Sequence, residues 1–147
     1  MLRPLDKTEK IENNIHCNCF ACGCQKNGLG LTFIKVSDTA VEAKWYCDEH
    51  FQSYPGIIHG GITATILDAA MTNCLLMQEI NGLTARMEIE YLKPVELNLE
   101  AEVFAEIVSS RPPLYVIESK IIQNGEIRAK AKAKFMKSDI FSDAMNK

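Results

Sequence analysis

The sequence lacks the features that assign a chain to several common classes of protein. Its 147 residues include 16 Lys and Arg against 19 Asp and Glu, a net charge of −3, so it lacks the basic excess of a groove that binds nucleic acid. No apolar run reaches the ~18 residues of a membrane-spanning helix, and the opening residues are too charged for a secretory signal peptide. We therefore expect a cytoplasmic protein with no nucleic-acid or membrane partner.

The sequence also lacks internal repeats, linkers and nucleotide-binding loops, because neither Gly-x-Gly-x-x-Gly nor Gly-Lys-Ser/Thr occurs in it. Its length suits a single domain with a sizeable core. We assign that domain to residues 29–137. Residues 1–28 form an N-terminal segment, in which 1–15 is a short helix or a frayed end, and residues 138–147 form a loose tail.

The stretch from His59 to Glu79 lacks proline and almost lacks charge. It is rich in Ala, Leu and Met, which favour helix, and Asn81-Gly82 follows as a left-handed stop. Between Ile62 and Gln78 the only charged residue is Asp68. Because apolar residues occupy nearly every face, we predict one long helix that is buried most of the way round.

A carboxylate in such a helix requires an explanation, since burying an unpaired charge costs several kcal/mol. No Lys or Arg lies one turn from Asp68, but Thr65 and Thr72 do. One interpretation is structural, with Asp68 accepting hydrogen bonds from these threonines or from another segment. The other is functional, with Asp68 as a general base or nucleophile in a cleft.

Alternating apolar residues predict strands on both sides of this helix. The expected strands are 29–34 and 41–45 before the helix, and 85–93, 97–107, 115–121 and 127–135 after it. In the last strand the odd positions from Ile127 to Phe135 should face inward, and the basic even positions from Arg128 to Lys134 outward. We expect that basic stripe to be a solvated face beside the glutamates at 100, 102 and 106. The order of elements indicates an α+β fold with an antiparallel sheet wrapped around one long central helix.

The predicted helix begins with His59-Gly60-Gly61. Backbone N–H groups at a helix N-terminus are unpaired and partly positive, so they can bind a carbonyl oxygen or an oxyanion; alternatively, the glycines form a tight turn with positive φ. Gly61 lies seven residues before Asp68, about 10 Å along the axis. One straight helix can hardly apply both groups to one substrate, so the spacing predicts a homodimer in which Gly61 of one chain meets Asp68 of the other.

Four of the six cysteines lie close together near the N-terminus, at positions 17, 19, 22 and 24. Cys19 and Cys22 form a Cys-x-x-Cys, a spacing typical of zinc ligands, and Cys17, Cys24 or His16 could add further ligands. No second Cys-x-x-Cys is present. The alternative is that these are reduced cysteines that help a short segment to pack.

Three motifs together resemble the hot-dog fold acyl-CoA thioesterases of the phenylacetate-pathway (PaaI-like) type. The sequence from His59 to Asp68, Tyr54-Pro55-Gly56 before it, and the stretch from Thr84 to Pro94 carry the resemblance, which extends over residues 29–135. The Cys-x-x-Cys-Gly segment is similar to a branch of that family with the same motif ahead of the first strand.

The resemblance implies a hot-dog fold, a two-fold dimer often paired into a tetramer, and hydrolysis of an acyl-CoA without a metal or a separate cofactor, since coenzyme A is part of the substrate. It gives Asp68 the role of general base or nucleophile, the Gly61 amide that of polarising the carbonyl, and His59 that of supporting the loop or leaving group. It places Thr84 where it orients water, and Ser53 or Gln52 near the polar residue ahead of His-Gly-Gly.

Substrate contacts are also expected from Gly60, Thr65 and Arg111. Arg111 precedes Pro112-Pro113 in an expected loop and is a candidate for a coenzyme A phosphate, since Arg binds phosphate as a planar fork; the alternative is a surface Arg. Aromatic and medium-chain acyl groups both suit the fold. Two other functions stay open: a non-catalytic acyl-CoA sensor, and a metal- or redox-responsive protein in which the cysteine segment is the working part.

Overall fold

Strands and one long helix make up most of residues 16–140, the part of the chain that this computed structural model describes. The elements are, in chain order, β1 (Ile34–Lys35), β2 (Ala40–Tyr46), the short 3-10 helix η1 (Glu49–Phe51), α2 (Gly60–Leu76), β3 (Gly82–Tyr91), β4 (Glu100–Arg111), β5 (Leu114–Gln123) and β6 (Glu126–Lys137). The predicted helix and the strands after it are confirmed, with ends shifted by a few residues. The predictions for residues 1–15 and for the tail beyond 140 lie outside the described residues.

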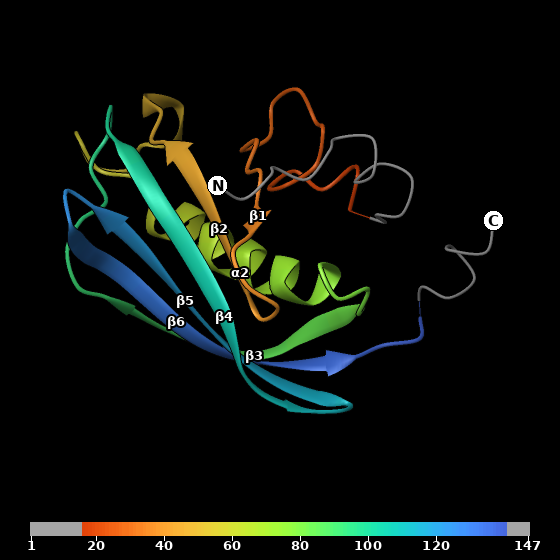
Figure 1. Cartoon of the computed structure of the whole chain (residues 1–147). Helices are drawn as coiled ribbons and strands as arrows, with labels where there is room; N and C mark the ends of the chain where they lie inside the picture. Colours follow the sequence, from red (N-terminus) through yellow and green to blue (C-terminus); the bar gives the residue numbers. More distant parts are fainter. Residues whose placement is uncertain (1–15, 141–147) are drawn as a thin grey trace.

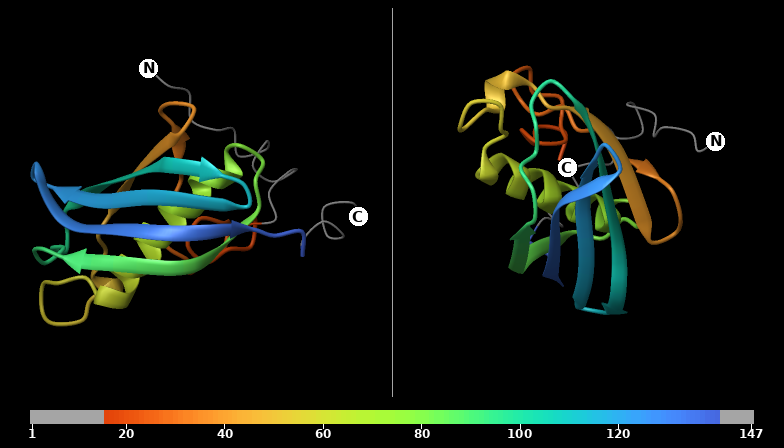
Figure 2. Two further views of the ribbon diagram at one scale, coloured as in Figure 1. Left: turned by 90° about the horizontal axis from the view of Figure 1, so that it is seen from below. Right: turned by 90° about the vertical axis from the view of Figure 1, so that its left-hand side faces the viewer.

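The strands form a single six-stranded antiparallel sheet with the order β1-β2-β4-β5-β6-β3. The sheet curls around α2, which contacts every strand from β2 to β6 (Figures 1 and 2). Inward residues alternate with outward ones along β4 and β5, as predicted, and the alanines of β6 at 129, 131 and 133 are buried. Within the described range, no helix is both long and apolar enough to cross a membrane.

The helix ends differently from the prediction. The left-handed residue is Glu79, with φ 58°, and not Asn81 or Gly82. The N–H of Ile80 donates to the carbonyl of Leu75, and that of Glu79 to Leu76, both at 3.0 Å, which is the Schellman pattern. Gly82 instead lies close to the helix, because a Cβ there would lie 2.6 Å from Cδ1 of Leu75 and that side chain would have to shift.

The strand predicted at 29–34 is mostly wrong, because only β1 at its end pairs with β2. Burial still alternates along the segment. Its backbone bonds instead to the cysteine-rich segment: Leu29 N–H donates to the Phe20 carbonyl at 2.7 Å, and Leu31 N–H to the Ala21 carbonyl at 3.0 Å. The N-terminal segment therefore replaces a neighbouring strand.

The inward row predicted for β6 is wrong at its start. Ile121 pairs with Ala129 but Ile122 pairs with Ile127, so Arg128 is the extra residue of a β-bulge. The bulge reverses the faces to which the two side chains point, so that Arg128 is only 7% exposed whereas Ile127 is 41% exposed. The buried guanidinium of Arg128 donates to a backbone carbonyl of the β3–β4 connection at 3.0 Å.

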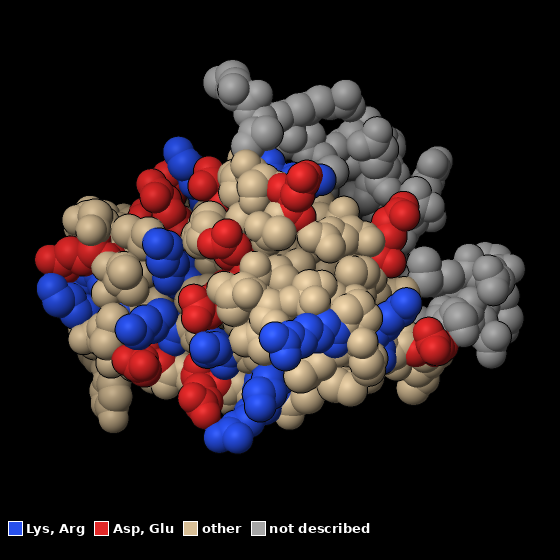
Figure 3. Space-filling model, turned by 60° about the horizontal axis from the view of Figure 1, so that its bottom comes forward, with Lys and Arg blue, Asp and Glu red and all other residues tan. Residues whose placement is uncertain are grey.

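The outer face of the sheet carries interspersed charges of both signs (Figure 3). Lys130 pairs with Glu90 of β3 at 3.8 Å, and Lys132 with Glu118 of β5 at 3.7 Å. The prediction that the glutamates of β4 lie beside this stripe is wrong, because β5 separates β4 from β6. Exposed pairs of this kind contribute little to stability.

Candidate active site

The side chain of His59 caps the first turn of α2. Its Nδ1 accepts a 2.9 Å hydrogen bond from the N–H of Gly61, so a ring nitrogen replaces the Ser, Thr, Asp or Asn oxygen usual at this position. A neutral imidazole that accepts at Nδ1 carries its proton on Nε2. A Cβ at position 61 would lie 3.1 Å from Nδ1 and Cε1 of His59, so only glycine leaves the ring undisturbed.

This cap limits which amides are open for a ligand. The Gly61 N–H is bonded to His59, whereas across residues 16–140 neither Gly60 N–H nor Ile62 N–H has an acceptor. Gly60 and Gly61 belong to the helix and have no positive φ, so the tight-turn interpretation is wrong. The helix N-terminus thus offers two unpaired, partly positive amides and a third that is bonded to the His59 ring.

The loop before His59 is closed by its own hydrogen bonds. The side-chain oxygen of Gln52 accepts from the N–H of Gly56 at 3.2 Å, and His59 N–H donates to the Phe51 carbonyl at 2.8 Å. Ser53 is exposed in the same loop. The structure therefore places Ser53 and Gln52 just ahead of the helix N-terminus, and it uses the oxygen of Gln52 to shape the loop.

Asp68 lies two turns into α2 and is half-buried in the single chain. One of its carboxylate oxygens accepts a 2.7 Å hydrogen bond from the hydroxyl of Thr84 on β3. A short bond to a carboxylate is stronger than one between neutral groups, and it fixes the rotamer of the acid. The hydrogen-bond donor to Asp68 is therefore a residue of another segment, and not Thr65 or Thr72 of the helix.

A β-bulge brings Thr84 to Asp68. Thr84 pairs with Phe135 and Arg86 pairs with Lys134, which leaves Ala85 as an extra residue in β3. Strict alternation would have put Thr84 on the opposite face from Met87, whereas the bulge turns it toward the helix. Bulges recur next to active sites because they redirect a side chain in this way.

Thr65 lies between Gly61 and Asp68 on the helix but does not bond to the acid. Its hydroxyl donates to the carbonyl of Gly61, one turn back, at 2.9 Å. Thr72, one turn beyond Asp68, is buried. The predicted polar residues therefore do follow one another along the helix, but Thr65 and Asp68 bond to different partners.

Tyr91 is a neighbour of the site that sequence reasoning missed. Its hydroxyl donates to the carbonyl of Gly60 at 3.0 Å, and its ring lies 3.7 Å from where a Cβ on Gly60 would sit. The sequence did contain a signal for Tyr91, because it follows Met87 and Ile89 in the row of β3 residues that faces the helix. Tyr91 holds the end of β3 against the first turn of α2.

The amides and the carboxylate lie in one continuous helix. Gly61 and Asp68 are seven residues apart in α2, about 10 Å along the axis. Positions 61, 65 and 68 follow helical spacing and share one side. A carbonyl oxygen bound at the first turn is therefore too far from the Asp68 of the same chain for direct chemistry, since reacting groups need to lie about 3 Å apart.

The prediction that Arg111 lies in a loop is wrong, because Arg111 is the last residue of β4. It pairs with Leu114 across the turn to β5 and is exposed. Its row of the sheet continues to Met136 of β6 and Leu83 of β3, at the end where β3 begins. This is the end beside the C-terminus of α2, opposite the amides of the first turn (Figure 2).

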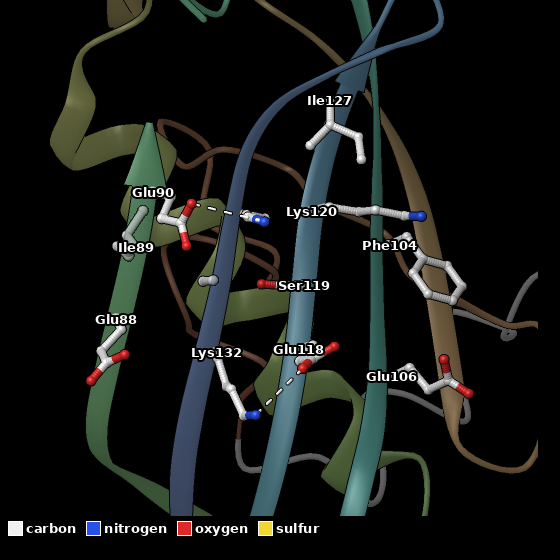
Figure 4. Close-up of a pocket in the computed structure, with 12 residues that line it drawn as sticks. Glu88, Ile89, Glu90, Phe104, Glu106, Glu118, Ser119, Lys120, Ile127 and Lys132 are labelled. Carbon is white, nitrogen blue, oxygen red and sulfur yellow. Dashed lines mark ion pairs between the residues drawn. The ribbon is translucent and has the colours of Figure 1, made fainter. Parts of the chain in front are cut away.

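A hollow lies on the outer face of the sheet, away from the candidate site (Figure 4). Glutamates and lysines of neighbouring strands line it, and the ion pair of Lys132 with Glu118 crosses its floor. None of His59, Gly61 or Asp68 contributes to its lining. Lys130 also pairs with Glu90, and the ammonium of Lys120 lies over the ring of Phe104.

The cysteine-rich segment contains the one metal-type cluster in residues 16–140. Side-chain ligand atoms of His16, Cys19 and Cys22 all lie within 4.8 Å of one another. Cys17 and Cys24, the other candidate ligands, do not belong to it. The two cysteines elsewhere are of another kind: burial raises the pKa of Cys47 to about 11 and that of Cys74 to about 12.

Comparison with known proteins points to one family. The model of the thioesterase superfamily matches residues 55–126, which include the His59-Gly60-Gly61 turn, Asp68 and Thr84. The cysteine-rich segment lies outside this match. The acyl-coenzyme A thioesterase THEM4 of the mouse, Mus musculus, is 40% identical over 48 residues, 33% of this chain and 20% of that protein. The match thus spans about a fifth of the length of this curated relative.

Solved structures share the fold. A hypothetical thioesterase from Streptococcus pneumoniae TIGR4, solved with coenzyme A, superposes with a TM-score of 0.70 at 23% identity, over 74% of this chain and 89% of that one. Zebrafish thioesterase superfamily member 2 superposes with a TM-score of 0.73 at 16% identity, over 84% of this chain and 94% of that one. At this level of identity the likeness is one of fold, and it confirms the predicted hot-dog arrangement.

Proposed function

We propose that this chain is a member of the thioesterase superfamily, whose model matches residues 55–126, and that it hydrolyses the thioester bond of an acyl-coenzyme A. The observation that carries the proposal is Asp68: a half-buried carboxylate, bonded to Thr84 at 2.7 Å, on a helix with no other charge. A structural role alone would be met by Asn or Ser at lower cost, since neither carries a charge into a largely apolar helix.

In the proposed reaction Asp68 acts as general base or as nucleophile. As a base it takes a proton from water, the water oxygen bonds to the carbonyl carbon, and the carbon–sulfur bond breaks; coenzyme A leaves as a thiolate and recovers the proton. As a nucleophile Asp68 attacks the carbonyl carbon, the carbon–sulfur bond breaks and coenzyme A leaves as a thiolate; water then hydrolyses the resulting acyl anhydride, which frees the acid and Asp68. In both cases Thr84 holds the carboxylate in its reactive rotamer.

The thioester carbonyl binds at the first turn of α2 in this proposal. Negative charge develops on its oxygen, and amide N–H groups at a helix N-terminus stabilise such charge. Gly61 exchanges its bond to His59 for one to the carbonyl oxygen, beside the unpaired amides of Gly60 and Ile62. The His59 ring, once released, lies near the departing thiolate. Ser53 and Thr65 flank this turn and contact the substrate.

The two parts of the site come from two chains. The ~10 Å between the Gly61 amide and Asp68 supports a two-fold dimer with antiparallel helices, in which each site takes amides from one chain and the acid from the other. The exposed side of the first half of α2 supports the same arrangement, because it carries both groups. Two such dimers pair into a tetramer in this proposal.

The experiment compares wild type with Asp68→Asn on phenylacetyl-, benzoyl- and straight-chain acyl-CoA esters, with free thiol release as the readout. We expect kcat to fall by a factor of about 10²–10⁴ with the melting temperature unchanged. Asp38→Asn is the matched control, because it makes the same change at an exposed turn. Equal turnover by wild type and Asp68→Asn would contradict the assignment, and the panel ranks aromatic against medium-chain acyl groups.

A second candidate function is binding of acyl-CoA without turnover. The observation that favours it is the bond between Gly61 and His59, which keeps the amide from a carbonyl. Under this alternative, one ester of the panel binds tightly by calorimetry while none releases thiol. Turnover that depends on Asp68 would exclude it.

A further inference from the structure

We propose that the cysteine loop, residues 16–24, binds one Zn²⁺ through a ring nitrogen of His16 and the thiolates of Cys19 and Cys22. This inference is independent of the proposed activity, since the loop lies outside the matched family region and apart from Asp68. The loop lies beside the segment that leads into β1 (Figure 1).

The three ligand atoms are already spaced for a tetrahedral ion. Zinc–sulfur bonds of about 2.3 Å and zinc–nitrogen bonds of about 2.0 Å place tetrahedral ligands roughly 3.5–3.8 Å from one another. The Cys22 sulfur lies 3.9 Å from Nδ1 of His16, and all three atoms lie within 4.8 Å. A contraction of about 1 Å or less would close the site around the ion.

The backbone of the loop holds these side chains in place. Cys19 N–H donates to the His16 carbonyl at 2.9 Å, and Gly23 N–H donates to the Cys19 carbonyl at 2.8 Å. At Gly23 a Cβ would lie 2.5–2.6 Å from backbone atoms of Cys19 and from the Cys17 carbonyl, so the turn requires glycine. The backbone of the turn therefore fixes the positions of Cys19 and Cys22.

The donor set selects the metal. One imidazole and two thiolates suit zinc, whereas magnesium and calcium take oxygen ligands. Cys22 is buried at 3% exposure and packs in the core, and Cys19 is half-buried against it. Three protein ligands come from residues 16–140, so a fourth ligand, water included, completes the tetrahedron.

Zinc at this position would hold the N-terminal segment onto the sheet. The two residues between the cysteines, Phe20 and Ala21, accept the backbone bonds from Leu29 and Leu31. Trp45 of β2 continues the connection, because its indole N–H donates to the Leu29 carbonyl at 2.9 Å. The ion therefore stabilises a segment that has few strand bonds of its own, and its binding free energy adds to that of folding.

The test measures metal in the full chain purified without chelator. Mass spectrometry of the metal content should give about one zinc per chain for wild type, with at least a tenfold loss in Cys19→Ser and in Cys22→Ser. Cys17→Ser and Cys24→Ser are matched controls, since they make the same change in the same loop outside the cluster, and they should keep the zinc.

A second measurement covers the case in which the cysteine variants do not fold. Wild type stripped of zinc and reloaded with Co²⁺ should develop thiolate-to-cobalt charge transfer and a tetrahedral d–d spectrum, and its melting temperature should rise with added Zn²⁺ and fall with chelator. Wild type without zinc and without a cobalt spectrum would overturn the proposal. So would a Cys19–Cys22 disulfide in the freshly purified protein, or loss of zinc from the two control variants alone.

Discussion

The two halves of α2 have similar apolar composition but very different surroundings. In the second half, seven consecutive residues from Ala69 to Leu75 are buried. In the first half only Thr63, Ile66 and Leu67 are, and the other side of the helix is open. The second half is therefore buried on every side, whereas the open side of the first half carries the candidate site. The apolar residues of the second half are explained by the core of the domain. Those on the open side of the first half require a partner chain or a substrate to cover them.

The sharpest test of this difference is truncation in the buried half. Leu75→Ala should lower the free energy of unfolding by about 2–5 kcal/mol, because Leu75 is 0% exposed and its removal leaves a cavity beside Gly82. Chemical denaturation measures this loss. Thr65→Ala in the open half is the comparison and should change stability by about 0.5 kcal/mol or less. Equal losses at both positions would remove the distinction between the halves.

The contact between Thr84 and Asp68 tests the open half from the side of the sheet. Thr84→Val keeps the shape but removes the hydroxyl, and it should lower kcat about 10- to 100-fold with little change in KM, since a bond to a charged group contributes about 1.5–3 kcal/mol. Thr84→Ser should restore most of the rate. A Ser variant as slow as the Val variant would mean that the hydroxyl does not position the acid.

Thiol labelling gives the mildest test. Cys74 belongs to the buried half, and burial raises its pKa to about 12; Cys47, with a pKa of about 11, is the other buried thiol. A raised pKa leaves less of the reactive thiolate. At pH 8 each of these two cysteines is deprotonated in roughly one molecule in 10³ or fewer. Alkylation followed by peptide mass spectrometry should modify exposed Cys24 at least 100-fold faster. Comparable labelling of Cys74 in the native state would mean that this half opens readily.

The sequence predicts the sheet faces well where strands are regular and poorly where they are not. Alternation assigns β4 and β5 correctly, because every second residue of a regular strand faces the core. The bulges at Ala85 and Arg128 reverse that assignment locally. A bulge depends on the register with the neighbouring strand, which is a long-range property with no local signal in residues of these types.

The site itself divides in the same way. The lone charge of Asp68 and the glycines before it are visible in the sequence, so their place on one helix could be predicted. The His59 cap, the Gln52 bond and the Tyr91 contact could not. Each depends on where a side chain finds a backbone group in three dimensions. The helix stop was also misjudged, because Asn81-Gly82 fits a stop by type while Glu79 provides it.

Mixed dimers test whether the site is shared between two chains. Asp68→Asn and Gly61→Val, the second of which displaces the His59 ring, are co-expressed with different tags and purified on both. If amides and acid come from different chains, each mixed dimer has one intact site of two and regains about half of the wild-type rate. Mixed dimers no more active than either variant alone would show that each chain builds its own site, and would contradict a site shared between two chains.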